Sequence, residues 1–326
     1  MVQAVARFVL GWLAVAVTTA APTTSWSFPE RPVRIVVPYA PGGGNDALAR
    51  VLGQKLEEHW GKPVIIENKS GGNTIIATDY IAKQPADGYN ILMVTTVFAV
   101  NPSLVQKLPY DTLRDFAPIV LAGTAPNVLV TKPSLPVNSV TDLIAYAHAN
   151  PGKLTYGFPG VGTTPHLAVE LFNHDARIKA VGVVYRGTQP QLLAMLQGDL
   201  DYMFDVTSSL EHVRLGKLKG LAVTVSKRLE TFPEIPTMVE AGLPGYEAAT
   251  WFGFAVPAGT PAEVINRINQ GFNDGIRDPT VRARVQALGI RLAGGSPQEF
   301  ERHVRAEMEK WGAVIRNAGI KPEGGR

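Results

Sequence analysis

Residues 33–52, VRIVVPYAPGGGNDALARVL, set the fold class because a strand, a glycine-rich turn and a helix follow one another within them. The apolar run at 33–37 is short and bounded by prolines, which is typical of a buried strand. Proline, glycine and asparagine at 38–45 predict a loop. Apolar residues then recur at helical spacing from Leu48, which predicts a helix that ends at Gly61.

The same alternation continues along the chain. Apolar runs at 64–67 and 91–94 flank a helical pattern at 75–82, and the alternation starts again after Gly123. It predicts an α/β fold in which helices cover a parallel sheet. In the second half, strands are predicted at 128–131, 154–157, 181–185, 200–204 and 221–225, and helices at 141–149, 166–173 and 189–197.

The last third of the chain is mostly helical, with one strand predicted at 251–256. Because it has little sheet of its own, this segment is expected to complete the first lobe. The chain must then cross between lobes near 123–126 and near 246–251. We therefore expect lobe 1 at 28–123 plus 250–326 and lobe 2 at 124–249.

Composition excludes several functions. The 326 residues are 45% hydrophobic, enough for a sizeable core, and the formal net charge is only +3. So weak a charge bias argues against nucleic acid as a partner. The absence of cysteine excludes disulfides, thiolate catalysis and cysteine-based metal sites. Metalloprotease, nucleophile-elbow and P-loop motifs are also missing, so we predict no catalytic residues, no metal and no cofactor.

The N-terminus predicts export. Arg7 is followed by the apolar run FVLGWLAVAV at 8–17 and by small residues at 18–21 that suit signal peptidase. A run of this length is too short to cross a bilayer; a short membrane anchor and a buried first helix are the alternatives. We expect residues 1–20 to be a cleaved signal peptide, the ordered protein to begin near Phe28, and its location to be the periplasm.

Two similar turns, one in each half of the chain, are the main functional signal. PYAPGGGND at 38–46 and GFPGVGTTPH at 157–166 each lie between a strand and a helix. Glycine lets backbone N–H groups approach a ligand, and a helix start adds unpaired N–H groups with partial positive charge. Two such turns facing across a cleft would hold a small acid from both sides. The alternative is that both are ordinary connecting loops.

A dinucleotide site is a competing interpretation of the first turn. The motif Gly42-x-Gly44-x-x-Ala47 matches the dinucleotide fingerprint, and Glu67 ends the next strand. Pro38 and Pro41, however, lie where that fingerprint needs a tight turn directly after the strand. An exported protein also meets little nicotinamide cofactor, so we favour an anion site over a dehydrogenase.

Two further polar residues are candidates for ligand contact. His166 lies at the second turn and is either a ligand contact or a polar residue in the first turn of a helix. Asp205 follows the alternating strand at 200–204 and is expected at its carboxyl end, between the lobes. Its alternative role is a helix cap or a turn acid.

A series of motifs gives the chain a resemblance to a known family. In order they are FPERPVRIVVPYAPGGGNDALAR, VIIENKSGG, ADGY, NPSL, LPYD, DFAPI, PGKLTYG, GTTPHL, MFD, GKLKGLAVT, PEIPTMVEAGLPGY and WFG. Over residues 28–322 they resemble the Bug family, the TctC-like periplasmic solute-binding proteins associated with tripartite tricarboxylate transporters.

The resemblance implies the type II periplasmic-binding-protein fold, with two α/β lobes that close on a ligand. It also implies that backbone N–H groups, hydroxyls and ordered waters of the two turns hold the ligand's carboxylates, and that Asp205 corresponds to an acidic cleft residue. The ligand-binding residues expected are Tyr39, Ala40, Gly43, Gly44, Asn45, Asp46, Thr96, Gly160, Gly162, Thr163, Thr164, His166 and Asp205.

Three departures from the family pattern are expected to make the cleft less polar: Val97-Phe98-Ala99, Pro165 and Val206. We therefore favour a mono- or dicarboxylate with some apolar body over a citrate-like triacid. The chain is predicted to be a monomeric receptor that delivers this acid to the membrane permease subunits of a tripartite tricarboxylate transporter or to a sensor. A secreted enzyme acting on a carboxylate is the alternative.

Overall fold

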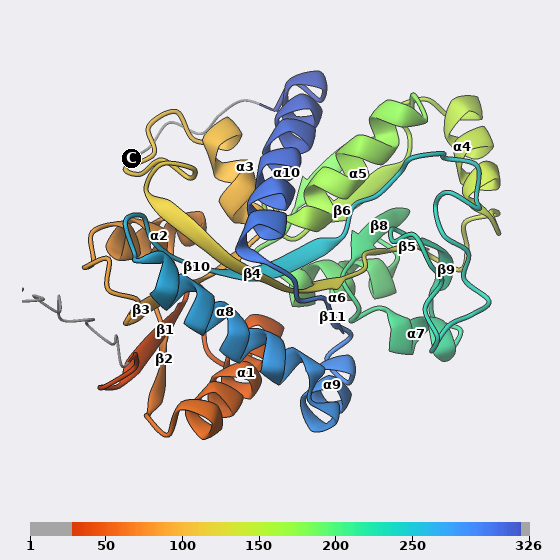
Figure 1. Ribbon diagram of the computed structural model, residues 1–326. Coiled ribbons are helices and arrows are strands. Elements are labelled where there is room, and N and C mark those ends of the chain that lie inside the picture. The colour runs from red at the N-terminus through yellow and green to blue at the C-terminus, as the bar shows by residue number, and fades with distance from the viewer. Residues whose placement is uncertain (1–27, 321–326) are drawn as a thin grey trace, which may run out of the picture.

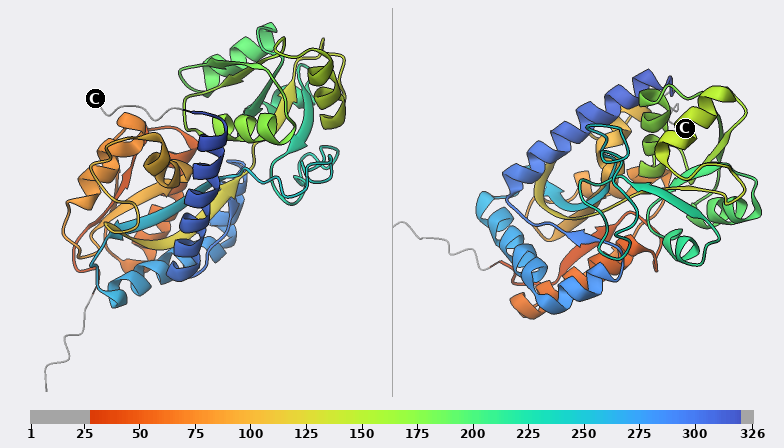
Figure 2. Two further views of the ribbon diagram at one scale, coloured as in Figure 1. Left: turned by 90° about the horizontal axis from the view of Figure 1, so that it is seen from above. Right: turned by 90° about the vertical axis from the view of Figure 1, so that its right-hand side faces the viewer.

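The computed structural model describes residues 28–320, so the signal peptide predicted at 1–20 lies outside the described residues. The chain forms two lobes, each built on a β-sheet with helices on both faces (Figures 1 and 2). The α/β class predicted from the strand–helix alternation is therefore confirmed.

The first sheet has six strands. They are β1 (Val33–Val37), β2 (Val64–Asn68), β3 (Asn90–Thr95), β4 (Phe116–Ala125), β10 (Thr250–Pro257) and β11 (Arg291–Leu292). In the order β11-β4-β10-β3-β1-β2, strands β1, β2 and β3 are parallel, whereas β10 is antiparallel to both β3 and β4. The sheet is thus mixed, which corrects the expectation of a purely parallel sheet. β10 runs in the opposite direction because it brings the chain back from the second lobe.

Helices cover both faces of this sheet. They are α1 (Gly44–Trp60), α2 (Ile75–Ala82), α3 (Thr96–Leu104), α8 (Ala262–Arg277), α9 (Pro279–Gln286) and α10 (Pro297–Asn317), with a short 3₁₀ turn at Gly72–Thr74. α1, α8 and α9 share one hydrophobic core, and α2, α3 and the first half of α10 share the other. The glycine-rich turn at 38–46 connects β1 to α1 at the edge of the sheet that faces the second lobe.

The second sheet has five strands in the order β7-β6-β8-β5-β9 and is also mixed. The strands are β5 (Val128–Thr131), β6 (Thr155–Phe158), β7 (Val181–Val184), β8 (Tyr202–Asp205) and β9 (Lys219–Val223). Helices α4 (Val140–Ala149) and α5 (Thr164–Asp175) cover one face, and α6 (Thr188–Gln197) and α7 (Leu210–Arg214) cover the other.

Hydrogen bonds tie together the two segments that connect the sheets. The chain passes from β4 to β5 through Pro126 and Asn127, and returns between β9 and β10. Asn127 is buried. Its backbone N–H donates to Thr224 Oγ1 at 2.9 Å, and its side chain donates to the carbonyl of Ala248. Thr224 Oγ1 donates to the same carbonyl at 2.9 Å. The two connections therefore act as one joint between the lobes.

The last helix reaches both lobes (Figure 1). Phe300 and Val304, in the first half of α10, pack on the first sheet. Trp311, Val314 and Ile315, in its second half, join the core formed by α4, α5 and the second sheet. The C-terminal segment thus packs against the second lobe as well as completing the first.

Candidate functional site

The first glycine turn leaves the start of α1 open. Gly43 is the N-cap of α1, with φ −82°, and no described side chain caps the helix. Pro41 to Gly44 are exposed, and a Cβ placed on Gly43 or Gly44 would meet no described atom within 4 Å. The N–H groups of residues 43–46 have no hydrogen-bond partner among the described residues. Unpaired N–H groups at a helix start attract an anion.

Asp46 shapes this turn. Its Oδ2 accepts hydrogen bonds from the Gly42 N–H and from Arg50 Nε, both at 2.9 Å, and its Oδ1 accepts one from Asn68 Nδ2 at 2.9 Å. Asn68 Nδ2 also donates to the carbonyl of Tyr39 at 3.0 Å. The hydrogen bond from Arg50, together with those from Gly42 and Asn68, lowers the pKa of Asp46 to about 2. The carboxylate is thus ionised, and both of its oxygens accept hydrogen bonds from other groups of the protein.

Tyr39 and Thr96 connect the turn to neighbouring strands. The hydroxyl of Tyr39 bonds Thr95 Oγ1 at 2.7 Å, and burial raises the pKa of this phenol to about 12. Thr96 is buried, and its Oγ1 accepts a hydrogen bond from the Trp251 N–H of β10 at 3.2 Å. Ala40, which follows Tyr39 in the first turn, is exposed. The Tyr39 hydroxyl thus joins the first turn to the end of β3, and the Thr96 hydroxyl joins the start of α3 to β10.

The second turn is more tightly packed. Gly162, with φ +75°, donates its N–H to His166 Nδ1 at 3.1 Å, so this amide is not available to a ligand. A Cβ on Gly162 would lie 2.2 Å from Leu104 Cδ1 of α3, which places the turn against the first lobe. Thr163 Oγ1 donates to the Gly160 carbonyl at 2.8 Å. No described side chain caps α5, and the N–H groups of Thr164 and His166 have no described partner.

The side chain of His166 holds this second turn in place. Its ring lies against Phe158, tilted by 35°, with 4.1 Å between ring centroids, and its Nε2 lies 3.7 Å from Glu170 Oε1. Glu170 in turn accepts a hydrogen bond from the hydroxyl of Tyr156. Burial lowers the pKa of His166 to about 4 and raises the pKa of Glu170. A neutral imidazole whose Nδ1 accepts the Gly162 N–H carries its proton on Nε2, facing Glu170.

Asp205 caps the next segment of chain. It is buried, and its oxygens accept hydrogen bonds from Ser208 Oγ at 2.9 and 2.8 Å and from the Ser209 N–H at 2.6 Å. These contacts correspond to the turn-acid role that the sequence left open. Both carboxylate oxygens are engaged in this geometry.

A third loop at the lobe junction was not assigned a role from sequence. Gly71, Gly72, Asn73 and Thr74 all have positive φ, from 50° to 127°. Asn73 Nδ2 donates to the buried Asn101 at 3.1 Å and lies 3.7 Å from where a Cβ on Gly162 would be. Left-handed backbone at non-glycine residues is strained and gathers at functional sites. The Gly71-Gly72 pair after β2 was the signal that could have found it.

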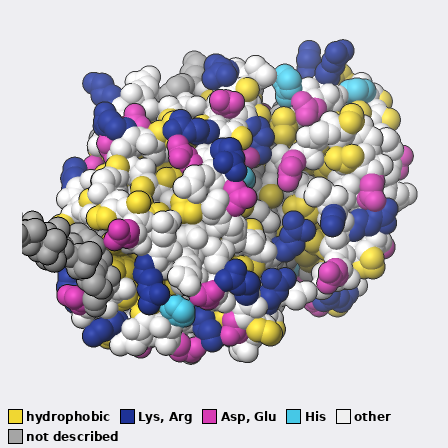
Figure 3. Space-filling model, in the orientation of Figure 1, with side chains coloured by type: hydrophobic (Ala, Val, Ile, Leu, Met, Phe, Trp, Pro, Cys, Tyr) yellow, Lys and Arg dark blue, Asp and Glu magenta, His cyan; other side chains and the backbone are white. Residues whose placement is uncertain are grey.

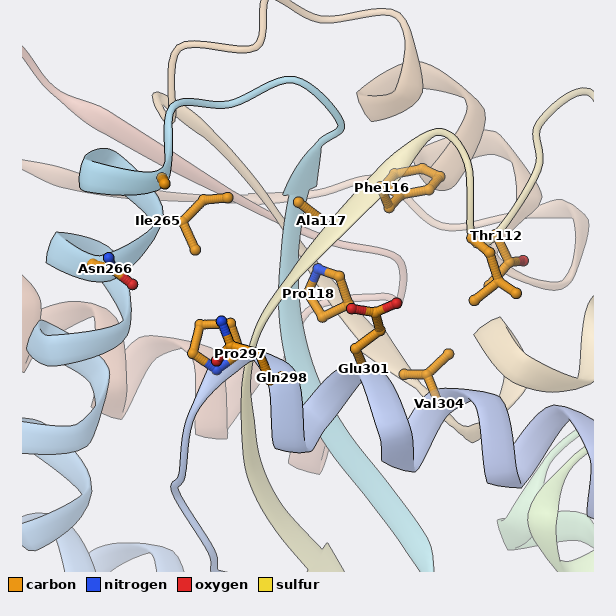
Figure 4. Close-up of a pocket in the computed structure, with 12 residues that line it drawn as sticks. Thr112, Phe116, Ala117, Pro118, Ile265, Asn266, Pro297, Gln298, Glu301 and Val304 are labelled. Carbon is orange, nitrogen blue, oxygen red and sulfur yellow. The ribbon is translucent and has the colours of Figure 1, made fainter.

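Two hollows lie elsewhere on residues 28–320, and none of the predicted ligand-binding residues lines either of them. The outer hollow, of about 350 Å³, lies between α8 and α10 with Pro118 of β4 between them (Figure 4). Glu301, its acidic side chain, is paired with Arg305 at 2.6 Å. The second, of about 360 Å³, lies where the lobes meet.

Within the described part of the chain, no group of three or more His, Asp or Glu side chains is arranged to hold a metal ion. No described helix is long and apolar enough to cross a membrane.

Comparison with known proteins identifies the family. The model described as the tripartite tricarboxylate transporter family receptor matches residues 48–320. The chain belongs to this receptor family. The resemblance drawn from the motifs is thereby confirmed, as is the expectation of a receptor over an enzyme, and the dehydrogenase interpretation is set aside.

This receptor is similar to curated and solved proteins over most of its length. Protein BugT of Bordetella pertussis is 35% identical over 93% of this chain and 94% of its own. The structure of R. palustris Rpa4515 with adipate is 38% identical with a TM-score of 0.80, covering 91% of this chain and 100% of that one. The periplasmic binding protein BugD is 31% identical with a TM-score of 0.77 over the same shares. The periplasmic-binding-protein fold implied by the resemblance is confirmed.

The residues at which this receptor departs from the family pattern are mostly packed into its hydrophobic cores. Phe98 and Ala99 are buried in the core shared by α2, α3 and α10. Val206 packs against the core under α1 and α8, and Pro165 is buried in the first turn of α5. That these residues make the cleft less polar stays a prediction.

Proposed function

We propose that this receptor captures a linear dicarboxylate between the starts of α1 and α5 and closes its lobes over it. The observation that carries the proposal is the open, uncapped start of α1, where the N–H groups of residues 43–46 lack partners among the described residues. α5 also begins without a side-chain cap, and the N–H groups of Thr164 and His166 lack partners among the described residues, although this turn is more tightly packed. Each helix start suits one carboxylate.

The choice of a dicarboxylate follows from the number of helix starts and from the nearest charges. Arg50 is the cation closest in sequence to the first turn, and Asp46 and Asn68 already engage it. A triacid would bring a third charge without a cation to meet it. Rpa4515, the structural neighbour solved with adipate, supports a six-carbon diacid as the first ligand to test.

The ligand-binding residues proposed are those of the two turns together with their supports. Gly43, Gly44 and Asn45 donate from the first lobe, and Thr164 donates from the second, where Thr163 shapes the turn through its bonds to the Gly160 carbonyl. Asp46, Tyr39, Thr96, Gly162, His166 and Asp205 hold these segments in place through the contacts described above. Ala40 and Gly160 give the backbone room to approach the acid.

The setting proposed is the periplasm. Residues 1–20 would be removed on export, and lobe 1 (28–123 plus 250–326) and lobe 2 (124–249) would move as two bodies about the joint at Asn127. The monomeric receptor then delivers the acid to the membrane subunits of a tripartite tricarboxylate transporter, or to a sensor. The apolar run after Arg7 and the description of BugD as periplasmic support this setting.

A thermal-shift screen of linear diacids from succinate to suberate, with citrate and adipamide as controls, tests the proposal. An acid at about 100 times its Kd should add about 2.7 kcal/mol of stability, a visible rise in melting temperature. Adipamide, which lacks the charges, should give no shift. Mass spectrometry should recover the bound diacid unchanged. The proposal fails if none of the linear diacids shifts the melting temperature, or if the acid is converted to a product.

A further inference from the structure

The junction hollow, the second of the two described above, takes one wall from each lobe. On one side are the end of β4, α9 and the start of β11; on the other are the segments after β8 and β9 and the start of α7. The walls meet where Gly289 approaches Thr207, since a Cβ on Gly289 would lie 2.7 Å from Thr207 Cγ2. A movement of the lobes must therefore change the shape of this hollow.

The hollow is strongly basic. Lys227, Arg228, Arg282 and Arg291 line it, against one acidic residue, Glu230. Arg228 is held by Glu240 at 2.8 Å. The other three cations are exposed, and within residues 28–320 their side chains form no ion pair or hydrogen bond. Figure 3 shows Lys and Arg side chains gathered along the lower part of the groove between the lobes.

Apolar side chains accompany these cations. Leu210, Val225 and Leu229 come from one lobe, and Ile290 and Leu292 from the other. Small-molecule sites bury converging polar groups, whereas exposed charges around an apolar patch steer and select a protein partner. Because the free cations here are exposed, the combination fits an acidic peptide segment with apolar residues better than a small acid.

We propose that the junction hollow docks an acidic segment of the membrane partner, and that this partner thereby distinguishes the open receptor from the closed one. The proposal rests on the proposed function, which supplies the membrane partner and the closure. A partner that binds residues of both lobes has a different affinity for each relative placement, so it can favour the loaded state. The cations supply long-range attraction, which weakens as ionic strength rises.

A charge-reversal variant tests the docking role. Lys227→Glu/Arg282→Glu/Arg291→Glu removes the three unpaired cations of the hollow. The matched control, Lys107→Glu/Lys153→Glu/Arg302→Glu, makes the same change of net charge at three exposed cations outside it. Calorimetry measures adipate binding to each purified protein. Uptake of radiolabelled adipate is measured in cells in which the transporter's membrane subunits depend on the added receptor.

The expected result separates binding from delivery. The hollow variant should bind adipate as the wild type does, yet support uptake that is roughly tenfold slower or worse, with a weaker dependence on salt. The control should match the wild type in both assays. Equal uptake by the two variants would overturn the docking role, and loss of adipate binding in the hollow variant would make the hollow a small-molecule site instead. A wild-type receptor that binds none of the screened acids would refute the proposed function itself.

Discussion

At the scale of single residues, Gly43 and Gly162 occupy similar places in the two turns but have different surroundings. Gly43 has an ordinary φ of −82° and open space where a Cβ would stand. Gly162 has φ +75°, and a Cβ there would press on Leu104 at 2.2 Å. A side chain at Gly43 should therefore obstruct a ligand, whereas one at Gly162 should disturb packing.

The change Gly43→Val should weaken adipate binding by at least about tenfold, because a charge-assisted hydrogen bond is worth roughly 1.5–3 kcal/mol. Its melting temperature should stay at the wild-type value, since nothing described lies within 4 Å. Gly162→Ala should instead lower the free energy of unfolding by about 1–3 kcal/mol. Titration calorimetry and urea unfolding measure the two effects. Normal binding by Gly43→Val would show that the first turn is only a connecting loop.

His166 should prove to be a positioning residue for the second turn. His166→Asn keeps an acceptor near the place of Nδ1, so the Gly162 N–H retains its bond. His166→Gln moves the amide toward the place of Nε2 and leaves that buried N–H unpaired, at a cost of about 1–3 kcal/mol. We expect weaker adipate binding and lower stability for Gln than for Asn. Equal behaviour of the two variants would remove this role.

The pKa of His166, lowered to about 4 by burial, also predicts a pH dependence. Between about pH 6.5 and pH 4 the unfolded chain binds a proton at His166 that the folded chain does not. Stability from this group is thus complete above pH 6.5 and falls as the pH drops, by up to about 3 kcal/mol. Urea unfolding at several pH values should show this slope in the wild type and a shallower one in His166→Asn. Parallel slopes would contradict it.

Residue types in the turns could be predicted, but their partners could not. The glycines of both turns and the threonines at the start of α5 are visible in the sequence. The hydrogen bonds that Asp46 accepts from Arg50, Asn68 and Gly42, in contrast, depend on β2 lying beside β1. The position of Asp205 at a strand end could be predicted from the sequence. Its hydrogen bonds with Ser208 and Ser209 could not, because they depend on the local geometry of the turn.

At the scale of elements, the regular strand–helix units were predictable and the irregular ones were not. β4 was missed because Pro118 and Gly123 interrupt its pattern, although it pairs with β10 along its length. α3 contains Pro102 and is buried nearly all round, so it shows no helical periodicity. The antiparallel direction of β10 could not be read locally, because it follows from the path of the chain through the other lobe.

Helix α10 is joined to β10 by a buried carboxylate, which gives a prediction at this scale. Glu307 accepts hydrogen bonds from Trp251 Nε1 at 3.0 Å and from Trp311 Nε1 at 2.7 Å. Both indoles bond Oε2, and Oε1 accepts a hydrogen bond from Lys310 Nζ. In Glu307→Gln these bonds lose the charge of the carboxylate, and the amide NH2 faces the Lys310 ammonium, so the free energy of unfolding should fall by about 1–3 kcal/mol. Glu309→Gln, an exposed change on the same helix, is the control. Equal urea midpoints for the two variants would count against this junction.

At the scale of the whole molecule, two mixed sheets meet through one joint at Asn127 and through the C-terminal helix. Closure about that joint would bring the two helix starts together and exclude water, which strengthens charge-assisted hydrogen bonds to a bound acid. The same movement would reshape the basic hollow at the junction. Capture and delivery would thus be two consequences of one displacement.

A crystal structure of the receptor grown with adipate is the most direct test. One carboxylate should lie about 2.7–3.1 Å from N–H groups of residues 43–46, and the other at the same range from Thr164 and its neighbours. Adipate found in the junction hollow, or held by side-chain cations away from both helix starts, would contradict the account.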